Sequence, residues 1–190
     1  MKKILLIFGT RPEAIKMAPL ILELNKNPKL FKTEICVTGQ HRQMLDQVLS
    51  LFNITPNFDL DIMLKNQDLY DITSNILLKL RDVLETSRPD LVIIHGDTCT
   101  TFTAALACFY KGIDFAHLEA GLRTYDLLNP WPEEANRQLC SKLASIHFAP
   151  TQKSAKNLTC ENIEHKNICV TGNTVVDALY HVMDKLKNSS

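Results

Sequence analysis

The chain has 190 residues, of which 45 % are hydrophobic, so it can form the core of one α/β domain but has little room for two. Lysine plus arginine and aspartate plus glutamate both number 21, and this zero net charge argues against a dedicated nucleic-acid-binding protein, which would carry a basic excess. No apolar run approaches the roughly 20 residues that a membrane-spanning helix needs, so no membrane partner is expected.

The N-terminal apolar run, at residues 4–8, imitates the start of a signal peptide. It is too short for one, and no small-x-small cleavage site follows it, so a first buried strand is predicted instead. The six cysteines include no C-x₂₋₄-C pair, which argues against a structural zinc site and a thioredoxin motif. We therefore expect a reduced chain in the cytoplasm.

Along the chain, short apolar runs alternate with longer segments of helical period. Strands are predicted at residues 3–8, 34–38, 91–95, 113–118, 146–149 and 168–171. Helices are predicted at residues 11–26, 40–52, 68–86, 99–111, 132–144, 151–159 and 174–187. Strands nearly continuous in Ile, Leu, Val and Phe are covered on both faces. The alternation predicts an α/β fold with a doubly wound parallel sheet, and residues 53–67 are the longest irregular segment.

The segment between the first predicted strand and helix combines a glycine, a capping pair and two cations. Thr10 with Glu13 matches a capping box, and Gly9 would let a ligand approach the backbone closely. Arg11 and Lys16 add positive charge at a helix start, where an anion is favoured. The segment is either a phosphate or diphosphate site or a well-capped helix with solvated cations. It lacks the Gly-Lys-Ser/Thr ending of a Walker A loop.

Polar residues also follow the second predicted strand, at Thr-Gly-Gln-His-Arg-Gln (38–43). The amides of Gln40 and Gln43 are suited to contacting a ligand. A polar helix start would have the same composition, so both interpretations stay open here.

Three carboxylates lie at the ends of predicted strands or at a helix start: Asp97, Glu119 and Glu133. In a parallel sheet such ends converge on one crevice, where these folds bind ligands. Three carboxylates in one crevice indicate proton transfer rather than simple binding. Asp97 also suits a helix cap, so capping and catalysis are open alternatives for it.

Glu119 has little local structural reason to be where it is, because glutamate is a poor turn and strand residue. In a partly desolvated crevice it can take a raised pKa suited to proton transfer. Glu133 and Glu134 both suit the first turn of a helix, and spacing does not choose between them. Trp131 fits either the core or a lid. His117 and His147 are predicted to be core residues rather than ligands, and no cluster has the spacing of a metal site.

Six segments taken together resemble the bacterial UDP-N-acetylglucosamine 2-epimerases of the non-hydrolysing kind. They lie in the same order and span nearly the whole chain. They are Phe-Gly-Thr-Arg-Pro-Glu-Ala-Ile-Lys-Met-Ala-Pro (8–19), Gln-His-Arg-Gln-Met-Leu-Asp-Gln-Val (40–48), His-Gly-Asp-Thr (95–98), Glu-Ala-Gly-Leu-Arg-Thr (119–124), Pro-Trp-Pro-Glu-Glu-Ala-Asn-Arg (130–137) and Thr-Gly-Asn-Thr-Val-Val-Asp-Ala-Leu (171–179).

The resemblance implies two Rossmann-like domains in the glycosyltransferase-B arrangement, with the active site in the cleft between them. This chain would be the N-terminal domain, over residues 1–173, with 174–190 a terminal helix that leads to a C-terminal domain absent from this chain. The domain that binds the uridine diphosphate would be the missing one. The 190 residues alone are therefore expected to be inactive and to bind substrate weakly.

The resemblance also implies roles for single residues. Asp97, Glu119 and Glu133 match catalytic carboxylates, and Arg11 and Lys16 match substrate-binding cations. Gln40 and Gln43 match residues of a second, regulatory UDP-N-acetylglucosamine site that some members have. In those members an arginine also serves that site, and Asn66 stands at its position here.

The implied reaction is the reversible C2 epimerisation of UDP-N-acetylglucosamine to UDP-N-acetylmannosamine. It eliminates UDP, gives a 2-acetamidoglucal and adds UDP back, with no metal or nicotinamide cofactor. The family implies a cytoplasmic homodimer that supplies precursors of surface polysaccharides. Two alternatives stay open: a glycosyltransferase or hydrolysing epimerase with the same architecture, and a nucleotide-sugar-binding half without enzyme activity.

Overall fold

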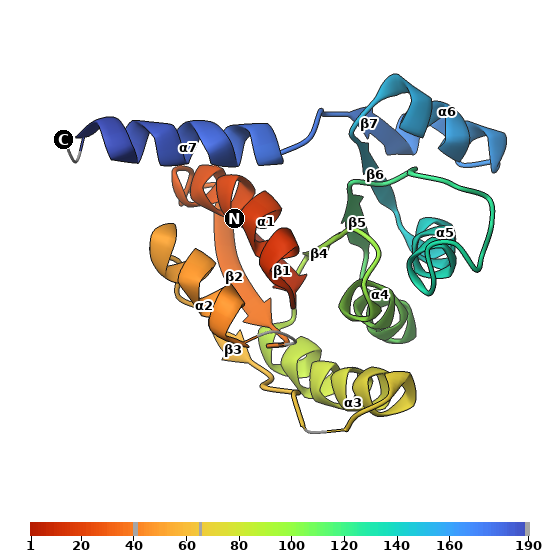
Figure 1. The fold of residues 1–190 in the computed structure, drawn as a ribbon, viewed down its shortest axis with the longest axis horizontal. Coiled ribbons are helices and arrows are strands. Elements are labelled where there is room, and N and C mark those ends of the chain that lie inside the picture. The colour runs from red at the N-terminus through yellow and green to blue at the C-terminus, as the bar shows by residue number, and fades with distance from the viewer. Residues whose placement is uncertain (40–41, 65, 189–190) are drawn as a thin grey trace.

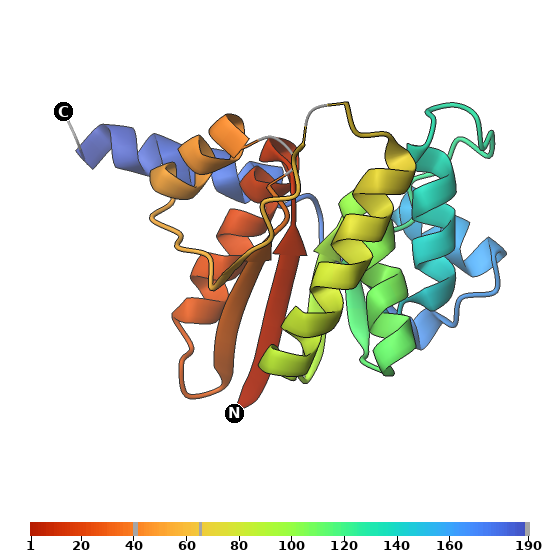
Figure 2. The ribbon, with the colours of Figure 1, turned by 90° about the horizontal axis from the view of Figure 1, so that it is seen from below.

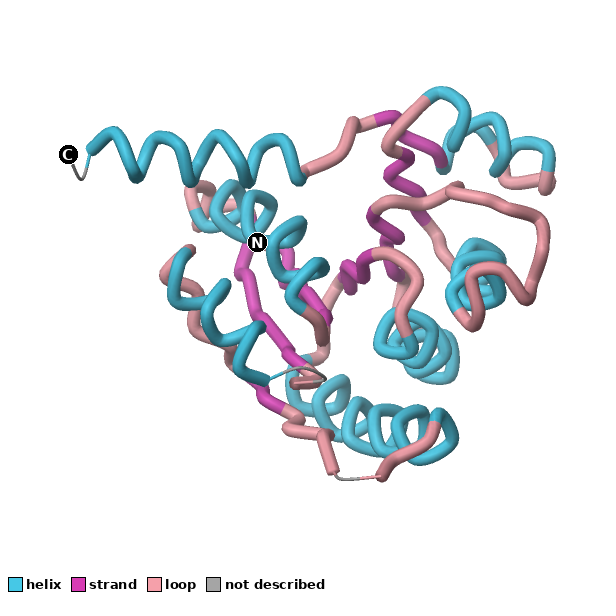
Figure 3. Tube along the Cα trace, viewed as in Figure 1, coloured by secondary structure: helices cyan, strands magenta, loops and turns pink. Residues whose placement is uncertain are grey.

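A computed structural model describes residues 1–39, 42–64 and 66–188. Across these residues runs a seven-stranded sheet of order β3-β2-β1-β4-β5-β6-β7, in which every neighbouring pair is parallel. The strands are β1 (Lys2–Phe8), β2 (Phe31–Val37), β3 (Phe58–Asp59), β4 (Leu91–His95), β5 (Phe115–Leu118), β6 (Ile146–Ala149) and β7 (Ile168–Val170). Figure 3 shows the strands as a central layer with helices on both sides.

The helices cover the two faces of the sheet as a doubly wound fold requires. They are α1 (Arg11–Asn25), α2 (Arg42–Leu51), α3 (Leu69–Ser87), α4 (Cys99–Lys111), α5 (Glu133–Leu143), α6 (Gln152–Cys160) and α7 (Val175–Asn188), with a 3₁₀ turn, η1 (His165–Asn167). In Figure 1, α1 and α2 lie on one side of the sheet and α3, α4 and α5 on the other, while α7 crosses over α1. The predicted α/β fold with a doubly wound parallel sheet is therefore confirmed.

Two differences from the predicted elements have simple physical causes. The segment 53–67, predicted to be irregular, contains the two-residue edge strand β3, which is too short to give a sequence pattern. Its placement follows from pairing with β2, where Asn57 donates its backbone N–H to the carbonyl of Ile35. β2 begins at Phe31 rather than residue 34, because its first three residues pair with β1 although they are not fully buried.

The core forms one apolar cluster on each face of the sheet, and β1 contributes side chains to both clusters. Leu6 and Phe8 belong to the cluster beneath α1 and α2, whereas Leu5 and Ile7 belong to the cluster beneath α3 and α4. This alternation explains why the run 4–8 is apolar at every position. His117 and His147 are completely buried, as predicted for core histidines.

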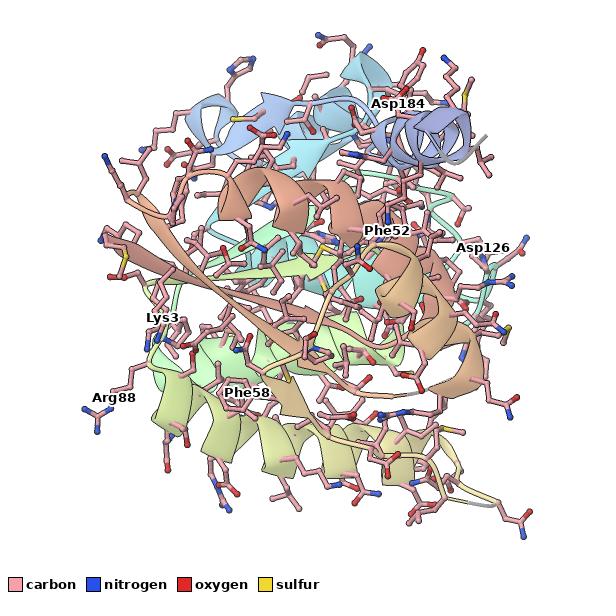
Figure 4. All side chains as sticks on the ribbon, turned by 90° about the vertical axis from the view of Figure 1, so that its left-hand side faces the viewer. Lys3, Phe52, Phe58, Arg88, Asp126 and Asp184 are labelled. Carbon is pink, nitrogen blue, oxygen red and sulfur yellow. The ribbon has the colours of Figure 1, made fainter. Side chains whose placement is uncertain are left out.

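The carboxyl ends of the strands gather at one end of the molecule. Figure 2 shows the arrowhead of β1 at the same end as the loop that precedes α5. In Figure 4, Lys3 and Arg88 lie at one end and Asp126, in that loop, lies at the other. The strand order reverses between β1 and β4, and the crevice outside such a reversal is where open α/β sheets bind ligands.

The six cysteines are free thiols. Cys36, Cys108 and Cys140 are buried and act as small apolar residues, and burial raises the pKa of Cys36 and Cys108 to about 12. Cys160 and Cys169 are exposed. Within the described part of the chain, none of the helices combines the length and the apolar character that crossing a membrane requires.

Candidate active site

The loop between β1 and α1 is held by the carboxylate of Glu13. Thr10 is the N-cap of α1, and the predicted capping box is confirmed. Glu13 Oε2 accepts hydrogen bonds from the backbone N–H groups of Gly9 and Thr10, at 2.8 and 2.7 Å, and from the Thr10 hydroxyl at 2.9 Å. The start of the helix is therefore fixed by a buried side chain of its own first turn.

The same carboxylate joins this loop to the one after β4. Its other oxygen, Oε1, accepts from the hydroxyls of Thr98 at 2.6 Å and Thr101 at 3.1 Å. Gly9 packs against Thr38, which follows β2, and Thr100 of α4: a Cβ there would clash with both hydroxyl oxygens. The two loops that flank the reversal of strand order thus form one closely packed unit.

Asp97 follows β4, and its side chain is partly exposed. It is not the cap of α4, because Thr98 fills that position and accepts the backbone N–H of Thr101. The capping interpretation of Asp97 is therefore wrong. Its side chain lies 3.4 Å from Arg137 Nη2, and its backbone carbonyl accepts from Asn136 Nδ2 at 2.8 Å.

The pKa of Asp97 is raised, chiefly by burial and further by the negative charges of Glu133 and Glu119. The cation of Arg137 opposes this rise only in part. The net effect favours the protonated form of Asp97 relative to an exposed aspartate.

Glu119 follows β5 and is surrounded by hydrogen-bond donors. Lys16 Nζ lies 2.8 and 2.6 Å from its two carboxylate oxygens, and Asn173 Nδ2 donates to Oε2 at 2.9 Å. His95 Nε2 lies 3.5 Å from the same oxygen. Glu119 adopts a φ of +65°, a left-handed conformation that costs a non-glycine residue on the order of 1 kcal/mol or more. Such strain is concentrated at functional sites.

The pKa of Glu119 is lowered to about 2, so the raised pKa expected from the sequence is wrong. Burial on its own would raise it, as predicted. The hydrogen bonds and charges of His95 and Lys16 outweigh burial, because they stabilise the ionised form. The sequence pattern could not reveal a cation from another element in contact with this carboxylate.

Glu133 and Glu134 have different surroundings in the structure, although their sequence spacing could not distinguish their roles. Glu134 is completely buried and accepts the backbone N–H groups of Thr124 and Tyr125, at 3.1 and 3.0 Å, so it holds the preceding loop. Glu133 is partly exposed at the start of α5, and its charge acts on Asp97. Glu133 therefore lies close enough for its charge to act on Asp97, whereas Glu134 holds the loop before α5.

The two predicted cations have different surroundings. Lys16 is paired with Glu119, whereas Arg11 is exposed and lines a cavity of about 340 Å³. The cavity lies between the loops after β1 and β4 and the first turns of α2, and it is lined by Thr10, Arg11, Pro12, Met44 and Thr98. Gln43 is exposed on α2 beside Met44, and Gln40 lies outside the described residues.

Three site residues were not singled out from the sequence: His95, Arg137 and Asn173. His95 is the last residue of β4 and Asn173 follows β7, so the rule that strand ends converge on the crevice could have found both. Arg137 lies one helical turn after Glu133 and contacts Asp97, and no local pattern marks it. Trp131 is exposed, which contradicts its core interpretation. Among the described residues, no three or more His, Cys, Asp and Glu side chains are grouped as metal ligands.

Comparison with known proteins gives relatives over the whole chain. A UDP-N-acetylglucosamine 2-epimerase of Campylobacter jejuni is 58 % identical over 188 residues, which cover 98 % of this chain and 49 % of that protein. The crystal structure of UDP-GlcNAc 2-epimerase from Neisseria meningitidis bound to UDP-GlcNAc is 58 % identical, with a TM-score of 0.94 over 97 % of this chain and 50 % of that one. The chain spans about half the length of the curated relatives it matches.

A more distant likeness concerns the fold alone. The apo form of a lipopolysaccharide outer core galactosyltransferase is 15 % identical, with a TM-score of 0.62 over 90 % of this chain and 45 % of that one. This likeness agrees with a glycosyltransferase-B-type half. The family model described as UDP-N-acetylglucosamine 2-epimerase matches residues 22–190, and the chain therefore belongs to this family.

Proposed function

We propose that this chain is the N-terminal domain of a non-hydrolysing UDP-N-acetylglucosamine 2-epimerase, which converts its substrate reversibly to UDP-N-acetylmannosamine. The observation that carries the proposal is the crevice in which Asp97, Glu119 and Glu133 meet while their environments differ. The pKa of Asp97 is raised and that of Glu119 is lowered, and carboxyl groups separated in this way are suited to opposite proton-transfer roles. The Neisseria relative, solved with bound UDP-GlcNAc, supports this substrate.

The chemistry requires more than removal and return of one proton, because the hydrogen on C2 of the sugar is not next to a carbonyl group. In the first step a carboxylate accepts the C2 proton, the electrons of the C–H bond form a C1–C2 double bond, and the C1–O bond breaks. UDP leaves with the electron pair of that bond, and a 2-acetamidoglucal remains. In the second step an oxygen of UDP bonds to C1 again while C2 takes a proton from the opposite face.

Glu119 and Asp97 are the residues assigned to the C2 proton, and Glu133 assists them. Glu119, with its low pKa, is ionised and is the partner that accepts a proton. Asp97, whose raised pKa makes it bind a proton more readily than an exposed aspartate does, is the partner assigned to return one. Glu133 adds negative charge near Asp97 and so favours the protonated form of Asp97.

Lys16 and Arg11 supply the positive charge that a departing diphosphate needs. Lys16 has a second task, because it is paired with Glu119 at 2.6 Å in the structure. When the ammonium turns toward a diphosphate, Glu119 loses an opposite charge and becomes a stronger base. Binding of the anionic group would thereby activate the proton acceptor.

A second domain after α7 completes the site and grips the uridine diphosphate. Residues 1–173 form the domain described above, and 174–190 lead to the second one. On this proposal the 190 residues alone are inactive. The whole protein is a homodimer of the cytoplasm, where its free thiols stay reduced, and it supplies precursors of surface polysaccharides. We assign Gln40 and Gln43 to a regulatory nucleotide-sugar site, and Gln43 lies in the first turn of α2.

Proton NMR of UDP-N-acetylglucosamine in D₂O tests the proposal, with the full-length protein and this chain measured side by side. Deuterium at C2, growth of the manno epimer and retention of UDP in the sugar nucleotide are expected with the full-length protein. The 190-residue chain should give none of these. No exchange at C2 with the full-length protein would reject the mechanism, and release of free UDP without return of a UDP-sugar would indicate a transferase or a hydrolysing epimerase.

A further inference from the structure

Asn173 connects the turn after β7 to the crevice. Its Oδ1 accepts the backbone N–H of Val175 at 3.0 Å, at the start of α7, and its Nδ2 donates to Glu119 Oε2 at 2.9 Å. The helix start needs an acceptor and the carboxylate needs a donor, so the two contacts fix which way the amide points. The Asn173 side chain thus contacts the start of α7 and the Glu119 carboxylate at the same time.

The next residue holds the same region by a second contact. The hydroxyl of Thr174 donates to the backbone carbonyl of Lys16 at 2.6 Å, and the ammonium of Lys16 is paired with Glu119. Two consecutive residues of the β7–α7 turn therefore contact both members of this ion pair. In Figure 1, α7 runs from this turn across α1, the helix that carries Lys16.

Lys16 and Asn173 act differently on Glu119. An ammonium on a flexible four-carbon chain supplies charge, but it can follow a carboxylate through several orientations. An amide whose oxygen is already used by a helix start supplies no charge and keeps one direction. Glu119 also has a strained backbone, so its carboxylate depends on such contacts for its orientation.

We propose that Asn173 is a positioning residue that orients Glu119 and makes the geometry of this carboxylate depend on the β7–α7 turn. The inference rests on the proposed function, because orientation of Glu119 affects turnover only if Glu119 transfers a proton. A movement of α7 away from α1 would break the Asn173 and Thr174 hydrogen bonds together. Through this turn, the orientation of the Glu119 carboxylate depends on the position of α7.

Three variants separate positioning from stability. Asn173→Asp keeps the acceptor for the start of α7 but places a carboxylate oxygen against Glu119. Asn173→Ser also keeps a side-chain oxygen that can accept the backbone N–H of Val175, but it is too short to reach Glu119. Asn157→Ser is the matched control, because Asn157 Nδ2 donates at 2.9 Å to the carbonyl of Gly121, so a similar hydrogen bond is lost elsewhere.

The first measurement is a ¹³C NMR titration of the Glu119 carboxyl group in the 190-residue chain. Asn173→Asp should raise the pKa of Glu119 by about one unit or more, because a like charge replaces a donor. Asn173→Ser should raise it less, and Asn157→Ser should leave it unchanged. An unchanged pKa in both Asn173 variants, with the fold intact by thermal unfolding, would overturn the proposal.

The second measurement is turnover by the full-length protein. We expect kcat to fall about 10- to 100-fold in both Asn173 variants, since a misplaced catalytic group has effects of this size, with KM little changed. The acidic limb of the pH profile of kcat should shift in Asn173→Asp as the pKa of Glu119 does. Absence of C2 exchange in the unmodified protein rejects the proposed function, whereas normal kcat in the Asn173 variants of an active enzyme rejects only the positioning role.

Discussion

The ammonium group of Lys16 lies within 2.8 Å of both carboxylate oxygens of Glu119, although 103 residues separate them. One group belongs to the predicted anion site and the other to the predicted proton-transfer site. Because the two groups are paired, binding of a charged ligand by Lys16 would change the ionisation of Glu119, the residue that would accept the proton of the ligand.

Replacing Lys16 should raise the pKa of Glu119. In Lys16→Met the carboxylate loses its closest cation while burial stays, so the pKa should rise from about 2 by roughly one unit or more. A ¹³C NMR titration of the Glu119 carboxyl group measures the change. Lys26→Met, which removes an exposed cation from the end of the same helix, is the control and should leave the pKa as it was. An equal pKa in Lys16→Met and the control would contradict the pairing.

The Glu119 carboxylate should stabilise the fold in a defined pH range. Its pKa is lowered from 4.5 to about 2, so its contribution is complete above pH 4.5 and is lost as the pH falls toward 2. A shift of this size corresponds to about 3 kcal/mol. Urea unfolding of the chain and of Glu119→Gln should differ by about this amount at pH 6 and progressively less below pH 4.5. A constant difference from pH 6 to pH 3 would refute the assignment.

Asp97→Asn should make the chain more stable at neutral pH and abolish turnover in the full-length protein. The raised pKa of Asp97 means that the folded state holds a proton more tightly than the unfolded state, so ionisation of Asp97 at neutral pH opposes folding. The neutral amide removes this penalty. Thermal unfolding at pH 7 checks the first effect and C2 exchange checks the second. A lower melting temperature would show that the carboxylate stabilises the fold.

The two adjacent glutamates of α5 should respond in opposite ways. Glu134→Gln should lower the free energy of unfolding by about 1–3 kcal/mol, because a buried acceptor of two backbone N–H groups loses its charge. Glu133→Gln should leave stability nearly unchanged and reduce turnover by the full-length protein. Denaturant unfolding and C2 exchange of both variants decide the point. If Glu134→Gln unfolds like the parent chain, Glu134 does not hold the loop.

The sequence predicted the fold well where a pattern is long and local. The run 4–8 is apolar throughout because both faces of β1 are covered, and its strand follows directly from composition. β3 has only two residues and lies at the edge of the sheet, so it produces no recognisable hydrophobic pattern in the sequence. Its position depends on hydrogen bonds from β2, which are contacts between distant parts of the chain.

For the candidate site, the sequence located several carboxylates at strand ends but not the contacts that set their pKa values. Position at strand ends was sufficient to select Asp97 and Glu119. The direction of the Glu119 pKa shift depended on Lys16 and His95, which come from other elements, so no local pattern could supply it. Asn173 could have been selected by its position after β7, but its contact with Glu119, 54 residues away, depends on the fold.

The carboxylate of Glu13 has a consequence for how the crevice can adapt. Because it accepts hydrogen bonds from the loop after β1 and from the loop after β4, the base of the crevice moves as one piece. A ligand of a different shape cannot be accommodated by parting these loops without breaking several buried bonds. In the loop over residues 124–131, by contrast, the side chains of Leu127 and Leu128 are exposed. Substitution of Leu127 or Leu128 should therefore leave the packing of the two strand-end loops intact, whereas loss of the Glu13 carboxylate should not.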